Sequence, residues 1–349
     1  MPIIPTTVER LLFFQLNQAP GPLLDLFGAV AFRIVLSAIR LGVFDTLTAG
    51  PISAGELARI LDADERGITI LLDTLVALGY VSQASGRYAN TAMTAKWLVR
   101  GSSSSIAAGF DYWGTLLAER WSDLEDTLRR GHPAENLYAW IEHQPTVSHD
   151  FQAWMIAAAR QLADEVLAKI SLPAGARRVL DIGGGHGIYS IALCRHYPAL
   201  AATVLDSPMA LQTARATIAA EQMAGQVGVQ EGDFLHDNLG TSYDVALLFN
   251  IVHGFTSEQN TALLCKVAQA LNPGGLVVIA EQVAGKSPGA VAPAIAQILG
   301  ISYFQLLGGR IYTYEEIAGW LTAAGFSKLG RKNLRKAPGN SLVMGYKAG

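Results

Sequence analysis

A short apolar run that ends in a cluster of glycines is the feature that most constrains the fold. Residues 178–182 (RVLDI) have the composition of a buried strand, and the glycine-rich segment 183–187 (GGGHG) follows at once. Glycines there allow a tight turn from strand to helix and let backbone amides approach a ligand. We therefore expect an open α/β sheet that begins near residue 178 and carries a ligand-binding loop after its first strand.

The rest of the C-terminal half alternates short β runs with helical segments. We expect strands at 202–205, 227–231, 245–249 and 276–281, with helices near 187–196, 208–223 and 257–271. This alternation predicts a parallel sheet with right-handed crossovers. Two last β runs, 327–334 and 341–346, flank a Pro-Gly-Asn turn and predict an antiparallel hairpin at the C-terminal end.

The N-terminal third is mainly helical. Residues 8–48 have helical spacing but are apolar on nearly every side, which is typical of a helix buried between elements or subunits. Helical segments that begin at the N-cap residues Ser53 and Asp64 precede β runs at 80–83 and 87–90. This order is the outline of a winged helix.

Composition excludes several classes of protein. With 349 residues, two domains are expected, and the 16% charged fraction favours a substantial subunit interface. A net charge of −3 argues against nucleic-acid binding. Cys194 and Cys265 predict buried thiols rather than a disulfide framework. The sequence shows neither a signal peptide nor an uncharged 18-residue apolar window, so we expect a cytoplasmic protein without membrane contact.

The details of the glycine loop indicate which ligand it holds. The third glycine of a dinucleotide fingerprint would fall on Ile188 or Ser190, and no P-loop lysine follows. Asp181, just before the turn, would repel a pyrophosphate but suits a positively charged ligand. S-adenosylmethionine carries a sulfonium and an ammonium and has no phosphate, so these residues favour it.

Two more acids follow the next two strands. Asp206 ends the second strand and can accept both hydroxyls of a ribose, while Asp233 and Phe234 follow the third, where they can bind the amino group and the ring of adenine. The carboxyl ends of consecutive strands are where open α/β sheets bind ligands. The predicted cofactor-binding residues are Asp181, Gly183, Gly185, Asp206, Asp233, Phe234 and Asn250.

The motifs VLDIGGGHG, LDSP, EGDF and LNPGGLVVIAE, with the loop around His253, resemble the class I small-molecule O-methyltransferases of plant and bacterial phenolics. The resemblance spans nearly the whole chain. It implies S-adenosylmethionine as methyl donor, a homodimer and independence from metal ions. It also implies a winged-helix-like dimerisation domain at 1–105, linking and substrate-lining helices at 106–170, and a Rossmann-like catalytic domain at 171–349.

The same resemblance implies a catalytic pair. His253 follows the fourth strand at the position of the family's catalytic histidine, and Glu281 ends the fifth strand, as does the family's carboxylate that orients this histidine. Histidine can remove a hydroxyl proton near neutral pH while the methyl group arrives. We therefore expect His253 to be the general base and Glu281 its orienting partner.

Three positions depart from the family pattern. Gly254 replaces the aspartate after the histidine, Phe249 replaces a lysine beside the adenine, and Ile311 replaces a second glutamate that flanks the histidine. The base is then held by one carboxylate, or Tyr312 or Tyr314 supplies the missing hydrogen bond. These departures leave open C-methylation and a non-methylating use of the cofactor, such as a rearrangement or decarboxylation.

The acceptor pocket is expected to be apolar and aromatic, which suits a flat hydrophobic molecule such as a phenol, a polyketide or a pigment precursor. The helix with the sequence DFQAWM resembles the family's substrate-lining helix. The predicted lining residues are Trp113, Phe151, Met155, Ile298, Tyr303 and Phe304. A DNA-binding regulator is disfavoured, because the would-be recognition helix carries Arg66 among acids and aliphatics.

Overall fold

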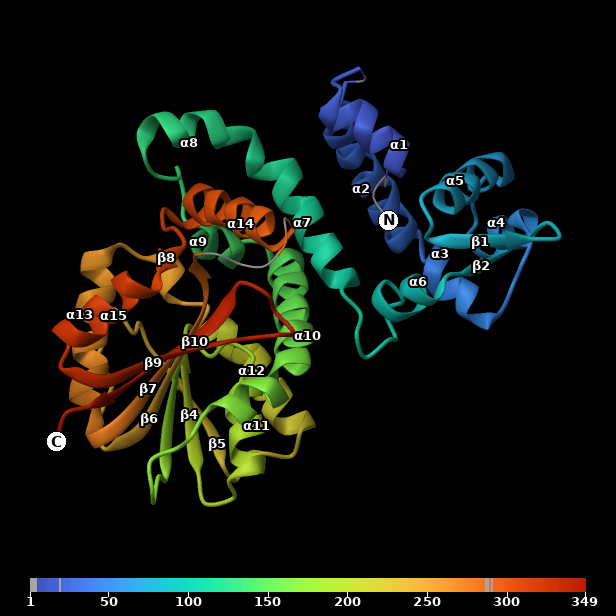
Figure 1. Ribbon diagram of the computed structural model, residues 1–349. Helices are drawn as coiled ribbons and strands as arrows, with labels where there is room; N and C mark the ends of the chain where they lie inside the picture. The colour runs from blue at the N-terminus through green and yellow to red at the C-terminus, as the bar shows by residue number, and fades with distance from the viewer. Residues whose placement is uncertain (1–4, 19, 286–288, 290) are drawn as a thin grey trace. The chain divides into compact units, whose positions relative to one another are not determined.

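The computed structural model describes residues 5–18, 20–285, 289 and 291–349 (Figure 1). The chain divides into two compact units, Met1–Ala118 and Glu119–Gly349. Each unit has its own hydrophobic core. The finer division at residues 105 and 170 stays a prediction.

The first unit is helical with one β ribbon. Ser53 and Glu56 form a reciprocal capping box at the start of α4, and the Asp64 side chain accepts the Gly67 amide at the start of α5. Strands β1 and β2 pair antiparallel after these helices, as the winged-helix outline predicts. The elements are α1 (Thr7–Arg10), η1 (Leu11–Gln15), α2 (Leu23–Leu41), α3 (Val43–Thr46), η2 (Leu47–Ala49), α4 (Ala54–Ile60), α5 (Glu65–Ala77), β1 (Val81–Ala84), β2 (Arg87–Asn90), α6 (Ala92–Trp97) and α7 (Ala107–Glu119).

Helix α2 differs between its two halves. Its C-terminal half is buried in the core through Val35, Leu36 and Ile39, while Leu26 and Phe27 near its start are more than half exposed. Packing between elements therefore accounts for part of the second half, and burial of the first half between subunits stays a prediction. Among the described residues no single helix has the length and apolarity to cross a membrane, whereas the bent pair Leu23–Leu41 and Val43–Ala49 meets that test by length and composition alone.

A buried carboxylate ties α2 and α7 together. Asp111 on α7 accepts hydrogen bonds from Arg40 Nε at 3.0 Å and Arg100 Nη2 at 2.9 Å, and only 9% of its side chain is exposed. Two arginines at the C-terminal ends of neighbouring elements thus share one carboxylate. Removing it would leave both guanidinium groups without this partner.

We predict that Asp111→Ala lowers the free energy of unfolding by about 2–3 kcal/mol, because two charge-assisted hydrogen bonds are lost and water replaces them only in part at the half-exposed arginines. Urea unfolding followed by circular dichroism measures the change. Asp126→Ala is the matched control, since Asp126 pairs with Arg129 on an exposed surface and such pairs contribute little. Equal stability of both variants would contradict the prediction.

The second unit is an eight-stranded, mostly parallel sheet between helices. The strand order is β5-β4-β3-β6-β7-β10-β9, and the short β8 pairs with the end of β7. Its helices are η3 (Trp121–Asp123), α8 (Leu124–Arg130), α9 (Leu137–Glu142), α10 (Pro145–Lys169), α11 (Ile188–His196), α12 (Pro208–Ala220), η4 (Val252–Gly254), α13 (Ser257–Ala270), α14 (Val291–Leu307) and α15 (Tyr314–Ala323). Its strands are β3 (Arg178–Ile182), β4 (Ala201–Asp206), β5 (Val227–Glu231), β6 (Tyr243–Phe249), β7 (Leu271–Ala284), β8 (Tyr312–Thr313), β9 (Phe326–Asn333) and β10 (Asn340–Lys347).

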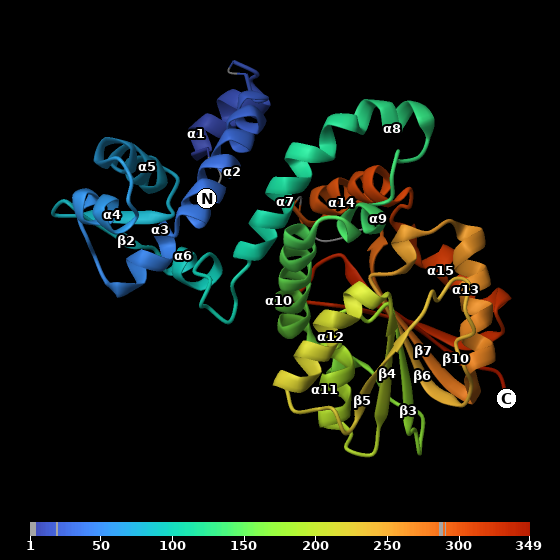
Figure 2. The ribbon, with the colours of Figure 1, turned by 180° about the vertical axis from the view of Figure 1, so that it is seen from behind.

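The predicted Rossmann-like sheet with an antiparallel C-terminal hairpin is confirmed. Strands β3 to β7 run parallel, and β10 lies antiparallel between β7 and β9. Figures 1 and 2 show α13 and α15 on one face of the sheet and α10, α11 and α12 on the other. Helices α9 and α14 lie at the end of the sheet where the parallel strands finish. This is the edge where a ligand is expected.

Several elements differ from the sequence prediction. Strand β7 begins at Leu271, five residues before the predicted start, because it pairs with Tyr243 across the Asn-Pro-Gly-Gly segment. Helix α12 ends at Ala220 rather than residue 223. The prediction omitted α14, α15 and β8, and α14 is apolar on most sides, so no periodicity marks it. Cys194 is buried, Cys265 is half-buried, and both are free thiols.

Candidate active site at the carboxyl edge of the sheet

The glycine loop after β3 forms the floor of the candidate site. Gly183, Gly185 and Gly187 have φ angles of 63°, 48° and 72°, in the left-handed region that favours glycine. A Cβ atom at Gly183 would overlap the Ile251 side chain, and one at Gly184 would lie 2.6 Å from the Asp181 carboxyl carbon. At Gly183 and Gly184 the backbone therefore passes against its neighbours with no room for a side chain.

Asp181 lies beneath this loop. Its Oδ2 accepts a hydrogen bond from Ser190 Oγ at 2.7 Å, so the carboxyl group connects β3 to α11. Burial raises its pKa to about 7, against the opposing effect of the Ser190 hydrogen bond. A positive charge bound above the loop would favour the ionised form. Its role as a direct cofactor contact stays a prediction.

Asp206 is joined directly to the glycine loop. Its Oδ2 accepts the Gly185 amide at 2.9 Å and its Oδ1 accepts the Ser207 amide at 2.7 Å. Burial raises the pKa of this carboxyl group, while the two backbone donors act in the opposite direction. Each carboxylate oxygen has a further lone pair. Asp206 can therefore hold the loop and accept hydroxyl groups of a ligand at the same time.

The loop after β5 is organised by its own side chains. Asp233 accepts the Leu235 amide at 2.9 Å and contacts His236 Nδ1 at 2.7 Å, and its pKa is lowered chiefly by His236. The neighbouring Phe234 ring lies 3.5 Å from the position of a Cβ on Gly183 and packs edge-on against Phe255. The Phe234 ring is thus beside the glycine loop, whereas the Asp233 carboxylate is engaged within its own turn.

Asn250 occupies the turn that follows β6. Its φ angle of 57° is left-handed, and its amide donates to the Ala280 carbonyl at 2.9 Å. This bond extends the pairing of β6 with β7 by one residue. The turn then leads directly into η4, which carries His253.

His253, which follows β6, and Glu281, near the end of the adjacent β7, form a buried pair. His253 Nδ1 lies 2.8 Å from Glu281 Oε2, and Glu281 Oε1 accepts the Val252 amide at 2.9 Å. The two side chains are 8% and 1% exposed. Because a carboxylate only accepts hydrogen bonds, we assign the ring proton to Nδ1, which leaves Nε2 as the acceptor nitrogen.

Two tyrosines that come from different helices lie near this pair. Tyr303 on α14 stacks on the His253 ring with 3.8 Å between centroids and 14° between planes. Tyr138 on α9 packs edge-on against Phe151, and burial together with the charges of Asp206 and Glu281 raises the pKa of its hydroxyl. Tyr138 was not predicted as a site residue. Its only sequence signal is membership of an aromatic-rich helical region.

The other predicted acceptor-lining residues are distributed over three helices. Phe151 on α10 packs edge-on against Tyr138 at 6.4 Å, and Met155 follows one turn later, half-buried. On α14, Ile298 is 57% exposed and Phe304 is half-buried. Trp113 belongs to α7 in the first unit, so its part in the pocket stays a prediction. Gln152, whose Oε1 is 3.6 Å from a Cβ built on Gly185, is a loop neighbour that the sequence did not suggest.

The departures from the family pattern have visible structural consequences. Phe249 packs edge-on against Tyr189 at 4.7 Å, where a lysine was expected. The Tyr312 hydroxyl donates to the Phe255 carbonyl, so the suggestion that Tyr312 completes the hydrogen bonding of His253 is wrong. Gly309 lies so close to the His253 carbonyl that a Cβ atom would overlap it. The segment before Ile311 therefore packs on the backbone of the histidine.

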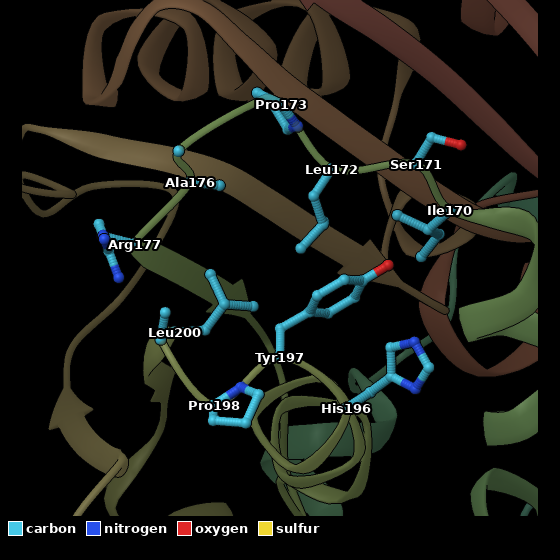
Figure 3. A pocket seen from close by; sticks show the side chains of 12 residues that line it. Ile170, Ser171, Leu172, Pro173, Ala176, Arg177, His196, Tyr197, Pro198 and Leu200 are labelled. Carbon is cyan, nitrogen blue, oxygen red and sulfur yellow. The ribbon is translucent and has the colours of Figure 1, made fainter.

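A hollow of about 590 Å³ lies at the opposite edge of the sheet (Figure 3). It is lined by residues that precede β3 and β4, among them Leu172, Arg177 and Tyr197. The predicted site residues are not among the twelve that line it. It provides a region for control substitutions far from the histidine.

Comparison with known proteins decides the family. Residues 121–327 match the O-methyltransferase domain family, and residues 24–100 match the O-methyltransferase dimerisation domain. The chain is 32% identical to 3-hydroxy-5-methyl-1-naphthoate 3-O-methyltransferase from Streptomyces sahachiroi, with 90% of this chain and 92% of that protein covered. The chain belongs to the O-methyltransferase family. It is an S-adenosylmethionine-dependent methyltransferase.

Two further proteins are similar to this chain, one in sequence and one in structure. L-tyrosine C(3)-methyltransferase from Streptomyces lavendulae is 28% identical, with 86% of this chain and 85% of that protein covered. Human N-acetylserotonin methyltransferase in complex with S-adenosylmethionine superposes with a TM-score of 0.82 at 24% identity, over 100% of both chains. The latter likeness concerns the fold.

The residues at the carboxyl edge fit S-adenosylmethionine. The backbone of the glycine loop leaves no room for a side chain at Gly183 and Gly184, and the carboxyl groups of Asp181 and Asp206 lie below and beside the loop. This acceptor-rich set complements a cation that also carries ribose hydroxyls. The cofactor, when bound, supplies a methyl group that its sulfonium already activates.

We predict that Asp206→Ala weakens S-adenosylmethionine binding by about 2–4 kcal/mol, because ribose hydroxyls lose a charged acceptor and the Gly185 amide loses its partner. Isothermal titration calorimetry measures the change. Glu221→Ala is the control, because Glu221 pairs with Arg160 and Arg195 on the surface beside α11. An unchanged affinity of the Asp206 variant would place the ribose elsewhere.

Proposed function

We propose that this enzyme methylates a hydroxyl group of a small aromatic or polyketide-like molecule, with His253 as general base. The observation that carries the proposal is the hydrogen bond between His253 Nδ1 and Glu281 Oε2, at 2.8 Å. It orients the imidazole and leaves Nε2 free to take a proton. The relative from Streptomyces sahachiroi is named for methylation of a hydroxyl on a naphthoate ring.

His253 and Glu281 assist methyl transfer to the acceptor oxygen by positioning the base and moving the hydroxyl proton. The acceptor oxygen forms a bond to the methyl carbon while the carbon–sulfur bond breaks and its electrons remain on sulfur. His253 Nε2 takes the hydroxyl proton, and the adjacent Glu281 carboxylate stabilises the resulting imidazolium. Burial of both side chains strengthens this interaction, because water does not screen it.

We further propose the cofactor and acceptor contacts. The cofactor would be held by Asp181, Gly183, Gly185, Asp206, Asp233, Phe234 and Asn250. The acceptor would be lined by Trp113, Phe151, Met155, Ile298, Tyr303 and Phe304. Two of these rings, Phe151 and Tyr303, come from different helices and lie near Tyr138 and His253 respectively. A flat hydrophobic acceptor would fit between aromatic side chains.

C-methylation is a second candidate, and one relative is named for it. A deprotonated phenol is nucleophilic at its ring carbons as well as at oxygen, so the same base could serve both reactions. Proton and carbon NMR of the product distinguishes a methoxy group from a ring methyl group. Release of S-adenosylhomocysteine separates both reactions from a rearrangement or decarboxylation without methyl transfer.

We predict that His253→Gln lowers kcat by about 10²–10⁴-fold, the usual contribution of general-base catalysis, and leaves S-adenosylmethionine affinity nearly unchanged. Glu281→Gln should lower kcat less, because the residue orients the base. Initial rates with labelled cofactor and a panel of phenolic and polyketide acceptors measure both effects.

The control for this experiment is His196→Gln. His196 lines the hollow at the opposite edge of the sheet, so its replacement should leave kcat unchanged. Near-normal methyl transfer by His253→Gln would show that proximity alone, or another group, carries the chemistry.

We also propose that the protein is a homodimer that works in the cytoplasm. Residues 24–100 match a dimerisation domain. Apolar side chains on the first half of α2 and before it are unusually exposed for a soluble surface. These are Val8, Leu11, Phe14, Leu16, Leu23, Leu26, Phe27 and Val30.

We predict that light scattering gives twice the chain mass of 37.2 kDa. Phe27→Glu should shift the protein toward monomer, because a charge would be buried in the interface. Ile60→Glu is the control, since Ile60 is a single exposed apolar residue on α4. A wild-type protein that stays monomeric at micromolar concentration would contradict the proposal.

A further inference from the structure

His253 has a second neighbour besides Glu281. The Tyr303 ring covers one face of the imidazole, 3.8 Å away and nearly parallel to it. We propose that Tyr303 is a positioning residue that holds the plane of the His253 ring for proton transfer. This inference rests on the proposed function, because it assumes that His253 is the base.

The Glu281 hydrogen bond alone leaves the imidazole plane poorly determined. It fixes the position of Nδ1, and the Val252 amide fixes the carboxylate through its other oxygen. The terminal torsion of a histidine has broad energy wells, so the ring can still tilt about the Nδ1–Oε2 direction. Such a tilt moves Nε2, the atom that must meet the hydroxyl proton. A flat ring packed on the imidazole face restricts this motion.

The helix that carries Tyr303 is itself well anchored. Ser302 and Gln305, on either side, are buried, and Gln305 Nε2 donates to the Arg120 carbonyl at 2.6 Å. Just beyond the helix, Gly309 lies against the His253 carbonyl. Tyr303 therefore presents its ring from a fixed element, while the following segment fixes the backbone of the histidine. Ile311, in the place of the family's second glutamate, offers no hydrogen bond to the imidazole.

The chemistry of the pair also suits proton transfer. A tyrosine face carries partial negative charge and stabilises a cation stacked on it, so the ring favours the imidazolium that forms during the reaction. Burial and the Glu281 charge raise the pKa of the Tyr303 hydroxyl, which keeps it a neutral phenol. Tyr303 therefore does not compete with His253 as a base, and its ring rather than its hydroxyl should matter.

The test compares two substitutions at position 303. Tyr303→Phe keeps the stacked ring, so its kcat should stay about tenfold or more above that of Tyr303→Leu. Tyr303→Leu removes the ring, and kcat should fall about 10–100-fold, the range expected when a catalytic group is misplaced. Calorimetric cofactor affinity should change much less than kcat, and the rise in acceptor KM that follows from the lost lining contact should be smaller than the fall in kcat. Thermal unfolding checks that each variant is folded.

A matched control exists at the opposite edge of the sheet. Tyr197 also packs on a histidine, His196, with 4.6 Å between ring centroids. Tyr197→Leu should leave kcat at the wild-type value. A loss comparable to that of Tyr303→Leu would mean that the fall reflects general loosening of the fold, and would overturn the proposal.

A double-mutant cycle shows whether Tyr303 acts through His253. In a His253→Gln background, Tyr303→Leu should lower kcat no further, because the group that it positions is gone. Additive losses, or a Tyr303→Phe variant as slow as Tyr303→Leu, would overturn the positioning role. The two proposals fail separately: an inactive His253→Gln with a fully active Tyr303→Leu contradicts only this inference. A fully active His253→Gln contradicts the proposed function itself, and this inference with it.

Discussion

The Glu281 carboxylate is the interaction on which the site depends. Its two oxygens accept hydrogen bonds from one short turn, one from the Val252 amide and one from the His253 ring. The side chain is 1% exposed, so without these donors its burial would cost several kcal/mol. The position follows from the sheet, since Glu281 lies near the end of the long strand β7, beside β6, which leads into His253. The Glu281 carboxylate thus fixes both the backbone of the turn after β6 and the ring of the candidate base.

The same edge gathers three buried or partly buried carboxyl groups, those of Asp181, Asp206 and Glu281. Burial raises the pKa values of Asp181 and Asp206, because a charge is unfavourable at a site shielded from water. Bringing these groups together is tolerable if a positive ligand shares the site. S-adenosylmethionine supplies that charge. Because a cation relieves the unfavourable burial of these carboxylates and a neutral or negative ligand does not, the site should select cationic ligands.

Much of this arrangement can be predicted from the sequence, because strands β3, β4 and β5 are short and each ends in, or is followed by, glycine or an acid. These strands and the acids at their ends follow from pattern, whereas the order of the strands in the sheet required the structure. Helix α14 has no polar face and gave no periodic signal, although it supplies Tyr303. Tyr138 and Gln152 come near the site through α9 and α10, far along the chain from the motifs. Contacts made by tertiary packing between distant helices leave no local pattern, so they required the structure.

The replacement of the family's second glutamate by Ile311 is consistent with the stacking of Tyr303 on His253. A second glutamate at position 311 would bring another negative charge beside Glu281, in an environment where carboxylates are already costly to bury. Ile311 avoids this cost and packs on α14 near Gly300. A stacked tyrosine can then orient the imidazole without adding a formal charge, and its quadrupole still favours the imidazolium. In the proposed arrangement, the face of the Tyr303 ring takes over the orienting role that a second carboxylate would have.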